Sequence, residues 1–221
     1  MENKKSYSTD GKVKHLSTEE DINIKLGKII GKKFIDYRKT WDAANNFEIV
    51  TDFPLFLHVD MNQTCNYKCP HCIIAYKDEV EGYYEGKNLN FEDYKKIVDE
   101  GSDYNCPSIS PQGNNEPFLI KDLHKYINYA YKKGFIDIML NNNGSAITPK
   151  RAQQVLDSGL TRIRFSLDAF SAESYPKVRV GAIPLEKVKK NIETFLNLKE
   201  QGNYKLPVTG VSFVKMKHNE H

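Results

Sequence analysis

From residue 55 onward, strand-like segments alternate with segments of helical spacing, and this order repeats four times before a fifth strand. Short apolar runs bounded by turn residues predict strands, and apolar residues three and four positions apart predict helices. The predicted strands occupy 55–61, 106–113, 135–140, 160–168 and 206–216. Strands that alternate with helices form a parallel sheet with right-handed crossovers. The sequence therefore predicts an α/β fold.

Each predicted helix carries apolar side chains along one face. The first helix is predicted over 90–101 and ends at Gly101. The third has Thr148 as N-cap and Pro149 at its first position. The four stripes are Phe91, Tyr94, Ile97 and Val98; Leu123, Ile127, Ala130 and Tyr131; Ala152, Val155 and Leu156; and Leu185, Val188, Ile192, Phe195 and Leu196. We expect these faces to pack against the sheet.

Chemically active residues follow the predicted strands. Cys65 comes after the first strand, Glu116 after the second, the run NNNG at 141–144 after the third, and Ser166 and Asp168 end the fourth. Parallel α/β sheets bind ligands at the carboxyl ends of their strands. One site along this rim is the simplest expectation, although NNNG is first of all a turn.

Residues 1–54 have a different character and are predicted to form an N-terminal extension to a core at 55–221. About the first fifteen are polar and are expected to be disordered. Ser17 and Glu20 resemble a capping box before a helix that starts near residue 22. The segment 34–54 carries the only tryptophan and is expected to wrap one side of the sheet.

Composition excludes several classes of protein. The formal net charge is +3, and basic residues are interspersed with acidic ones, which argues against a nucleic-acid surface. No apolar run approaches the roughly 20 residues of a membrane span. The N-terminus lacks the apolar region of a secretion signal, so we predict a cytoplasmic protein.

Three of the four cysteines lie within eight residues, CNYKCPHC at 65–72. Exported disulfide scaffolds spread their cysteines and are usually shorter, so this cluster indicates metal or redox chemistry. Cys106 stands apart before an apolar stretch and is predicted to be a buried small hydrophobe.

Two metal centres compete for the triplet. Structural zinc prefers four ligands in two separated pairs, and the chain has no second pair; His71 is adjacent to Cys72, and neighbours rarely reach one tetrahedral ion together. A 4Fe-4S cluster normally takes four cysteines, so three leave one iron free of protein ligands. An open iron can bind and activate another molecule.

The C-x3-C-x2-C spacing after the first strand resembles the cluster motif of the radical S-adenosylmethionine enzymes. GNNEP at 113–117 is similar to their Gly-Gly-Glu-Pro element, with Asn114 and Asn115 in place of glycines. SLDAFSAESYPKVRVG at 166–181 resembles their Ser-x-Asp segment with a downstream arginine. The resemblance covers about 55–220, with its elements in the same order.

The resemblance implies roles for individual residues. Cys65, Cys69 and Cys72 would hold a [4Fe-4S] cluster whose open iron binds S-adenosylmethionine. Glu116 and the backbone near Asn115 would receive the methionine ammonium; Ser166 and Asp168 would face the ribose or carboxylate; Arg179 would bind a carboxylate; and His71 would pack near adenine. Plain structural interpretations stay open: a helix start at Glu116, a turn at Ser166 and Asp168, a surface arginine and an exposed loop histidine.

The family also implies a reaction and an architecture. Its members cleave S-adenosylmethionine reductively to a 5′-deoxyadenosyl radical that abstracts hydrogen from a small, sugar-type or peptide substrate, with flavodoxin or ferredoxin as electron donor. Their partial TIM-like barrel usually has six β-α units, so five strands suggest truncation after the fifth. The lead-in at 41–66 resembles that of the branch with a C-terminal auxiliary-cluster domain of the SPASM/twitch type, a domain expected to be absent here. A non-catalytic metal module and an inactive barrel acting as a partner subunit are the alternatives.

Overall fold

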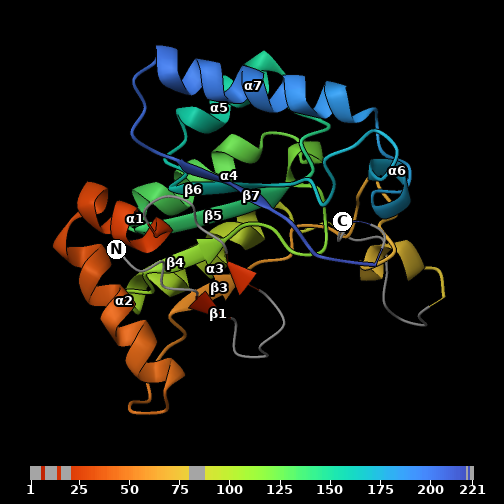
Figure 1. The fold of residues 1–221 in the computed structure, drawn as a ribbon. Coiled ribbons are helices and arrows are strands. Elements are labelled where there is room, and N and C mark those ends of the chain that lie inside the picture. Colours follow the sequence, from red (N-terminus) through yellow and green to blue (C-terminus); the bar gives the residue numbers. More distant parts are fainter. Residues whose placement is uncertain (1–5, 8–13, 16–20, 80–87, 218, 220–221) are drawn as a thin grey trace.

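The computed structural model describes residues 6–7, 14–15, 21–79, 88–217 and 219. Five parallel strands form one sheet, and each strand pairs with the strand that precedes it in the chain (Figure 1). The strands are β3 (Phe56–His58), β4 (Ser108–Ser110), β5 (Asp137–Asn142), β6 (Arg162–Ser166) and β7 (Val208–Ser212). The predicted α/β fold with a parallel sheet is confirmed.

The connections between the strands are helical, as predicted. The main helices are α3 (Phe91–Asp103), α4 (Leu123–Lys132), α5 (Pro149–Leu156) and α7 (Leu185–Gln201), and shorter turns are η1 (Ile73–Tyr76), η2 (Pro117–Leu119) and α6 (Tyr175–Val178). The four main helices pack on one face of the sheet, with α5 against α7 (Figure 1). The turn α6 was not predicted.

Alternation along the strands separates the two faces of the sheet. Ile109, Ile138, Ile163 and Phe165 are fully or almost fully buried in the core beneath the helices. The ring of Phe165 meets Phe195 of α7 edge to face, with centroids 5.7 Å apart. The opposite face carries mainly polar side chains, because successive residues of a strand point to opposite sides.

Three details of the helix predictions are wrong. Gly101 does not stop α3 but lies inside it. A Cβ at this position would come within 2.8 Å of Leu57 and 2.9 Å of Phe135, so only glycine fits there without a shift of these side chains. Tyr131 and Leu196 do not join the buried faces of their helices; they are 54% and 38% exposed. Close packing of the helix, rather than termination, therefore explains the glycine.

The start of α5 agrees with its sequence. Thr148 has extended backbone angles, and its hydroxyl accepts a hydrogen bond from the backbone N–H of Arg151 at 3.3 Å. Pro149 occupies the first position of the helix, where its missing N–H leaves no hydrogen bond unmade. The predicted cap is confirmed.

Helices α1 (Ile22–Ile30) and α2 (Lys32–Asn45) lie at the amino ends of the strands (Figure 1). Leu26, Phe34 and Tyr37 form a second small core with Val208 of β7. The cap of α1 is Asp21, whose carboxylate accepts from the N–H of Asn23 at 2.7 Å; the predicted capping box at Ser17 and Glu20 lies outside the described residues.

Near the N-terminus, β1 (Ser6–Tyr7) and β2 (Lys14–His15) pair antiparallel. They lie within the stretch for which the sequence predicts disorder, and most residues around them are outside the described part, so that prediction and the boundary at residue 54 stay predictions. Over the described residues, no helix combines the length and apolar character that a membrane crossing requires.

Candidate metal centre

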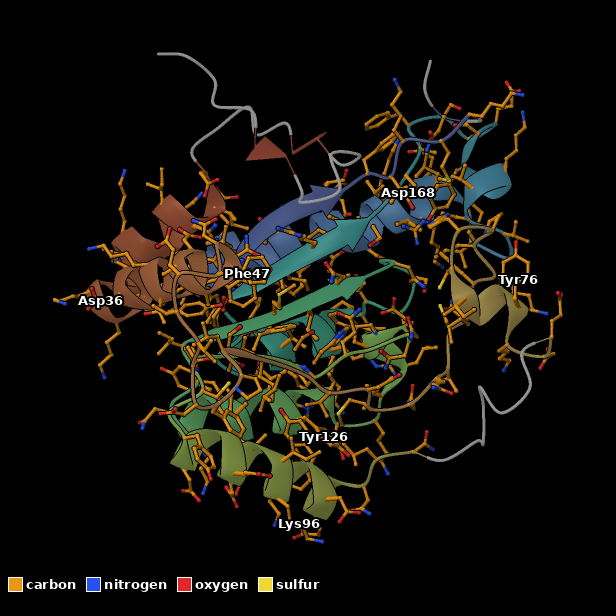
Figure 2. All side chains as sticks on the ribbon, turned by 90° about the horizontal axis from the view of Figure 1, so that it is seen from below. Asp36, Phe47, Tyr76, Lys96, Tyr126 and Asp168 are labelled. Carbon is orange, nitrogen blue, oxygen red and sulfur yellow. The ribbon has the colours of Figure 1, made fainter. Side chains whose placement is uncertain are left out.

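The three clustered cysteines lie on the long connection between β3 and η1. Cys72 is the residue before η1, and its backbone N–H donates to the carbonyl of Cys69 at 2.9 Å, which curls this part of the loop. Figure 2 shows Tyr76 of η1 and Asp168 at the same end of the molecule, opposite to Asp36 and Phe47. The cysteine loop therefore stands at the carboxyl ends of the strands, where the sequence places the site.

All three thiols are free and at least partly buried. Burial raises the pKa of the Cys65 thiol, and the backbone N–H of Tyr67, 3.5 Å from its Sγ, opposes this shift. Burial also raises the pKa of Cys69, against the positive charge of Arg179. The thiols of Cys65 and Cys69 are therefore protonated at neutral pH, and a metal ion would have to displace their protons to bind.

Hydrogen-bond donors from distant parts of the chain reach two of the sulfurs. The guanidinium of Arg179 donates to Sγ of Cys69 at 3.6 Å, and the side-chain amide of Asn143 donates to Sγ of Cys65 at 3.9 Å. Donors of this kind stabilise metal-bound thiolates and tune the reduction potential of iron–sulfur clusters. The chemistry around the sulfurs thus fits an anionic cluster.

The described residues contain no group of three or more histidine, cysteine or acidic side chains arranged around a single metal ion. A tetrahedral zinc ion requires its ligands to meet at one point. In a 4Fe-4S cluster each thiolate binds a different iron, so the sulfurs stand further apart. The cysteine triplet is compatible with the second arrangement.

Glu116, directly before η2, is 2% exposed and uses both carboxylate oxygens within the protein. Oε1 accepts from the N–H of Phe118 at 3.0 Å, and Oε2 accepts from the N–H of Asn143 at 2.7 Å. Burial raises its pKa to about 7, although the two N–H groups and Arg179 pull in the opposite direction. The helix-start interpretation is confirmed, and the role toward a cofactor ammonium stays a prediction.

The segment GNNEP is attached to the cysteine loop. The N–H of Glu116 donates to the carbonyl of Thr64 at 2.9 Å, and the amide of Asn115 donates to Oδ1 of Asn62 at 3.2 Å. Gly113 is required at its position because a Cβ there would overlap the side chain of Asp60. The loops after β3 and β4 therefore form one unit.

Asp168 has a positive φ of 56° and a fully buried side chain. It forms an ion pair with Arg179, its Oδ1 accepts from the N–H of Val214 at 2.8 Å, and Nε2 of His71 lies 3.4 Å from Oδ2. Burial acts to raise its pKa, but His71, Arg179 and the N–H of Val214 together hold that pKa below its ordinary value. The charged carboxylate therefore connects the segment after β6 to the cysteine loop, through His71, and to the segment after β7, through Val214.

Three of the predicted site residues lie together in space, and Ser166 lies apart from them. His71, Asp168 and Arg179 meet beside Cys69, and Arg179 is 8% exposed, so the surface-arginine interpretation is wrong. Ser166 lies lower on β6, opposite Ser212 of β7. Contacts of Ser166 and Asp168 with a ribose or a carboxylate stay predictions.

Asn143 is the site residue that sequence reasoning undervalued. It is 4% exposed, its N–H binds Glu116, and its side-chain amide bridges Asn66 at 3.0 Å as well as Cys65. The NNNG run at a strand end was the available signal. Tyr67, 1% exposed within the cysteine loop, carried no comparable signal.

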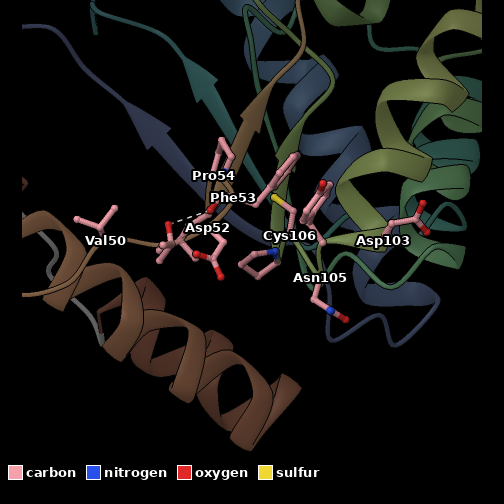
Figure 3. Close-up of a pocket in the computed structure, with 11 residues that line it drawn as sticks. Val50, Asp52, Phe53, Pro54, Asp103, Asn105 and Cys106 are labelled. Atoms are coloured by element: carbon pink, nitrogen blue, oxygen red, sulfur yellow. Dashed lines mark hydrogen bonds between the residues drawn. The ribbon is translucent and has the colours of Figure 1, made fainter.

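A separate hollow of about 430 Å³ lies at the opposite end of the sheet (Figure 3). Residues 50–55 and 103–107 line it, and the rings of Phe53 and Tyr104 stack with centroids 4.6 Å apart. Cys106 is 4% exposed beside it, which confirms its prediction as a buried residue. This hollow is separate from the cysteine triplet.

A model of the radical SAM superfamily matches residues 59–208, which is more than half of the chain and includes the three clustered cysteines, Glu116, Asp168 and Arg179. The chain belongs to the radical SAM superfamily. The family predicted from the sequence is confirmed, and members of this superfamily bind a [4Fe-4S] cluster and S-adenosylmethionine.

Several curated relatives of this radical SAM chain are about one-third identical to it over the aligned residues. A probable GTP 3′,8-cyclase of Methanococcus maripaludis is 34% identical over 129 residues, which are 58% of this chain and 41% of that protein. The GTP 3′,8-cyclase of Aliarcobacter butzleri is 32% identical over 162 residues, 71% of this chain and 48% of that protein. The chain thus spans less than half the length of these relatives.

Solved structures share the fold at low identity. Streptococcus suis SuiB has a TM-score of 0.60 at 17% identity, covering 83% of this chain and 38% of its own. BtrN in complex with AdoMet and 2-DOIA has a TM-score of 0.51 at 20% identity, covering 73% and 58%. These likenesses support the partial barrel of radical SAM proteins.

Proposed function

We propose that this chain is the cofactor-binding core of a radical SAM enzyme acting on a small molecule. The observation that carries the proposal is the cysteine triplet at the carboxyl rim of the sheet, with Arg179 and Asn143 donating to two of its sulfurs. Cys65, Cys69 and Cys72 would hold the cluster, and with three protein ligands one iron would stay free to bind S-adenosylmethionine. The bound cofactors supply reductive cleavage of S-adenosylmethionine and a 5′-deoxyadenosyl radical that takes hydrogen from the substrate.

The protein's own residues position and shield this chemistry. Arg179 and Asn143 stabilise thiolates that burial would otherwise keep protonated. Glu116, with a pKa near neutrality, holds the loop of Asn143 and accepts the cofactor ammonium when charged. His71 is an exposed loop residue whose side chain is about a quarter exposed beside Asp168, and it offers a flat ring to adenine.

The relatives support a small-molecule substrate, because those at 32–34% identity are named as GTP 3′,8-cyclases. Peptide modification is the second candidate, supported by the likeness to SuiB, which was solved bound to a precursor peptide. The electron that reduces the cluster would come from a flavodoxin or a ferredoxin. A cytoplasmic location is also part of it, because four free thiols are typical of a reducing compartment.

The test is anaerobic reconstitution with iron and sulfide, followed by dithionite and S-adenosylmethionine. We expect a brown protein that forms 5′-deoxyadenosine, measured by liquid chromatography and mass spectrometry. Cys69→Ala should lose both colour and product, whereas Cys106→Ala, which removes the thiol outside the triplet, should keep both. A colourless zinc protein would favour the metal module, and a brown protein without product would favour the inactive barrel.

A further inference from the structure

The face of the sheet opposite to the main helices carries a row of polar groups, which we call the polar face. It comprises Ser108, Ser110, Asp137, Asn141, Arg162, Arg164 and Ser166, which alternate along their strands with the buried apolar residues. Cross-strand register aligns Asn141 of β5 with Arg164 of β6. A polar face inside an α/β fold is suited to binding a polar molecule rather than to packing.

Near the amino ends of the strands, the charges of Asp137 and Arg162 on the polar face balance each other. Asp137 is fully buried and forms an ion pair with Arg162. The phenol of Tyr37 on α2 lies near Asp137 and Ser108, both of which influence its pKa. The small core of α1 and α2 covers the sheet from this side. A ligand on the polar face would therefore lie above Asp137.

Arg164 stands above this pair, two residues before Ser166 and four before Asp168. Its neighbour on β7 is Gly210, and a Cβ at that glycine would lie 4.0 Å from Cγ of Arg164. Because the glycine has no side chain, no side chain from this position of β7 packs against the arginine stem. Asn141, on the other side, adds an amide at the same height.

No carboxylate of the described residues forms an ion pair with Arg164, in contrast to Arg162 and Arg179. Burial lowers the pKa of its guanidinium, repulsion from Arg162 adds to this shift, and only Asp137 opposes it. An arginine nevertheless remains charged in proteins. A half-buried cation that forms no ion pair with a described carboxylate, beside a glycine on a polar face, suits an anion from outside the chain.

We propose that Arg164 binds an anionic group of the substrate, a phosphate or a carboxylate, on the polar face of the sheet. The inference rests on the proposed function only in that the occupant is the enzyme's substrate. Arg164 lies below the rim that holds the cofactor, so an anion bound there places the rest of the substrate toward that rim. The substrate class is thus a small polar anion.

The test measures anion binding directly, by isothermal titration of the reconstituted protein with pyrophosphate, GTP, guanosine and succinate. We expect either pyrophosphate and GTP or succinate to bind. If GTP binds, guanosine, which lacks the phosphates, should bind at least tenfold more weakly. Arg164→Gln should weaken the binding of the anion at least tenfold, and Arg164→Lys less. Arg151→Gln, on the exposed side of α5, is the matched control and should leave binding unchanged.

A second readout needs no substitution. Phenylglyoxal modifies accessible arginines, and peptide mass spectrometry reports the modified fraction at each position. The bound anion should protect Arg164 and leave Arg151 reactive. The proposal is overturned by equal binding in wild type and Arg164→Gln, by the absence of binding of every anion tested, or by unprotected Arg164. Cluster content and 5′-deoxyadenosine, measured in parallel, report on the proposed function independently.

Discussion

Glu116 offers a sharp test of how the site is built, because a buried carboxylate with a pKa near neutrality makes stability depend on pH. Its pKa is raised to about 7 from a usual value of 4.5, so the folded state binds the proton more tightly than the unfolded chain. Stability from this group is complete below the unfolded pKa and is lost as pH rises through the folded one.

The size of the effect follows from the two pKa values. A difference of 2.5 units corresponds to about 3 kcal/mol in total, of which about 2 kcal/mol falls between pH 5.5 and pH 8. The depressed pKa of Asp168 acts in the opposite direction at lower pH. Burial also raises the pKa of Asp60, which acts in the same direction as Glu116, so the contribution of Glu116 is measured as the difference between wild type and Glu116→Gln. Wild-type protein should therefore be less stable at pH 8 than at pH 5.5.

The assay is urea unfolding of the apo protein at both pH values, for wild type, Glu116→Gln and Glu193→Gln. Glu116→Gln should remove about 2 kcal/mol of the pH dependence. It also leaves one of two backbone N–H groups without an acceptor, at a cost of about 1–3 kcal/mol at either pH, so the slope is the informative quantity. Glu193 is exposed on α7, and its variant should keep the wild-type slope. Equal slopes for wild type and Glu116→Gln would refute the reasoning.

Two further predictions concern contacts that hold the site and the sheet. Arg179→Gln should lower the free energy of unfolding by about 3 kcal/mol or more, because it leaves the buried Asp168 without its ion-pair partner. The same change should make the cluster potential more negative in a redox titration followed by electron paramagnetic resonance, and an unchanged potential would show that the donation to sulfur is unimportant. Gly101→Ala should cost about 1–3 kcal/mol in urea unfolding, because its methyl group would press on Leu57; a gain in stability would contradict the packing explanation.

The order of the elements and the position of the site could be predicted because their signals are local. Thr148 and Pro149 mark a helix start by their own chemistry, and the spacing of the cysteines is visible in eight residues. Parallel topology then brings the strand ends to one rim, so Cys65 and Glu116 could be placed near each other from the sequence.

The remaining features depend on contacts between residues far apart in the chain. The ion pair of Asp168 and Arg179 depends on how the segment around α6 folds back, and no pattern predicted α6. Gly101 resembles a helix stop unless the side chain of Leu57 is known to press against it. The exposure of Tyr131 likewise follows from how α4 is oriented on the sheet.

The central claim is that three thiolates bind three irons and leave the fourth for S-adenosylmethionine. Mössbauer spectroscopy of protein reconstituted with ⁵⁷Fe, before and after addition of S-adenosylmethionine, tests this claim directly. We expect the spectrum of a four-iron cluster in which the cofactor changes the signal of one iron and leaves the others unaltered. A spectrum that does not respond to the cofactor, or a protein that retains zinc in place of iron, would contradict it.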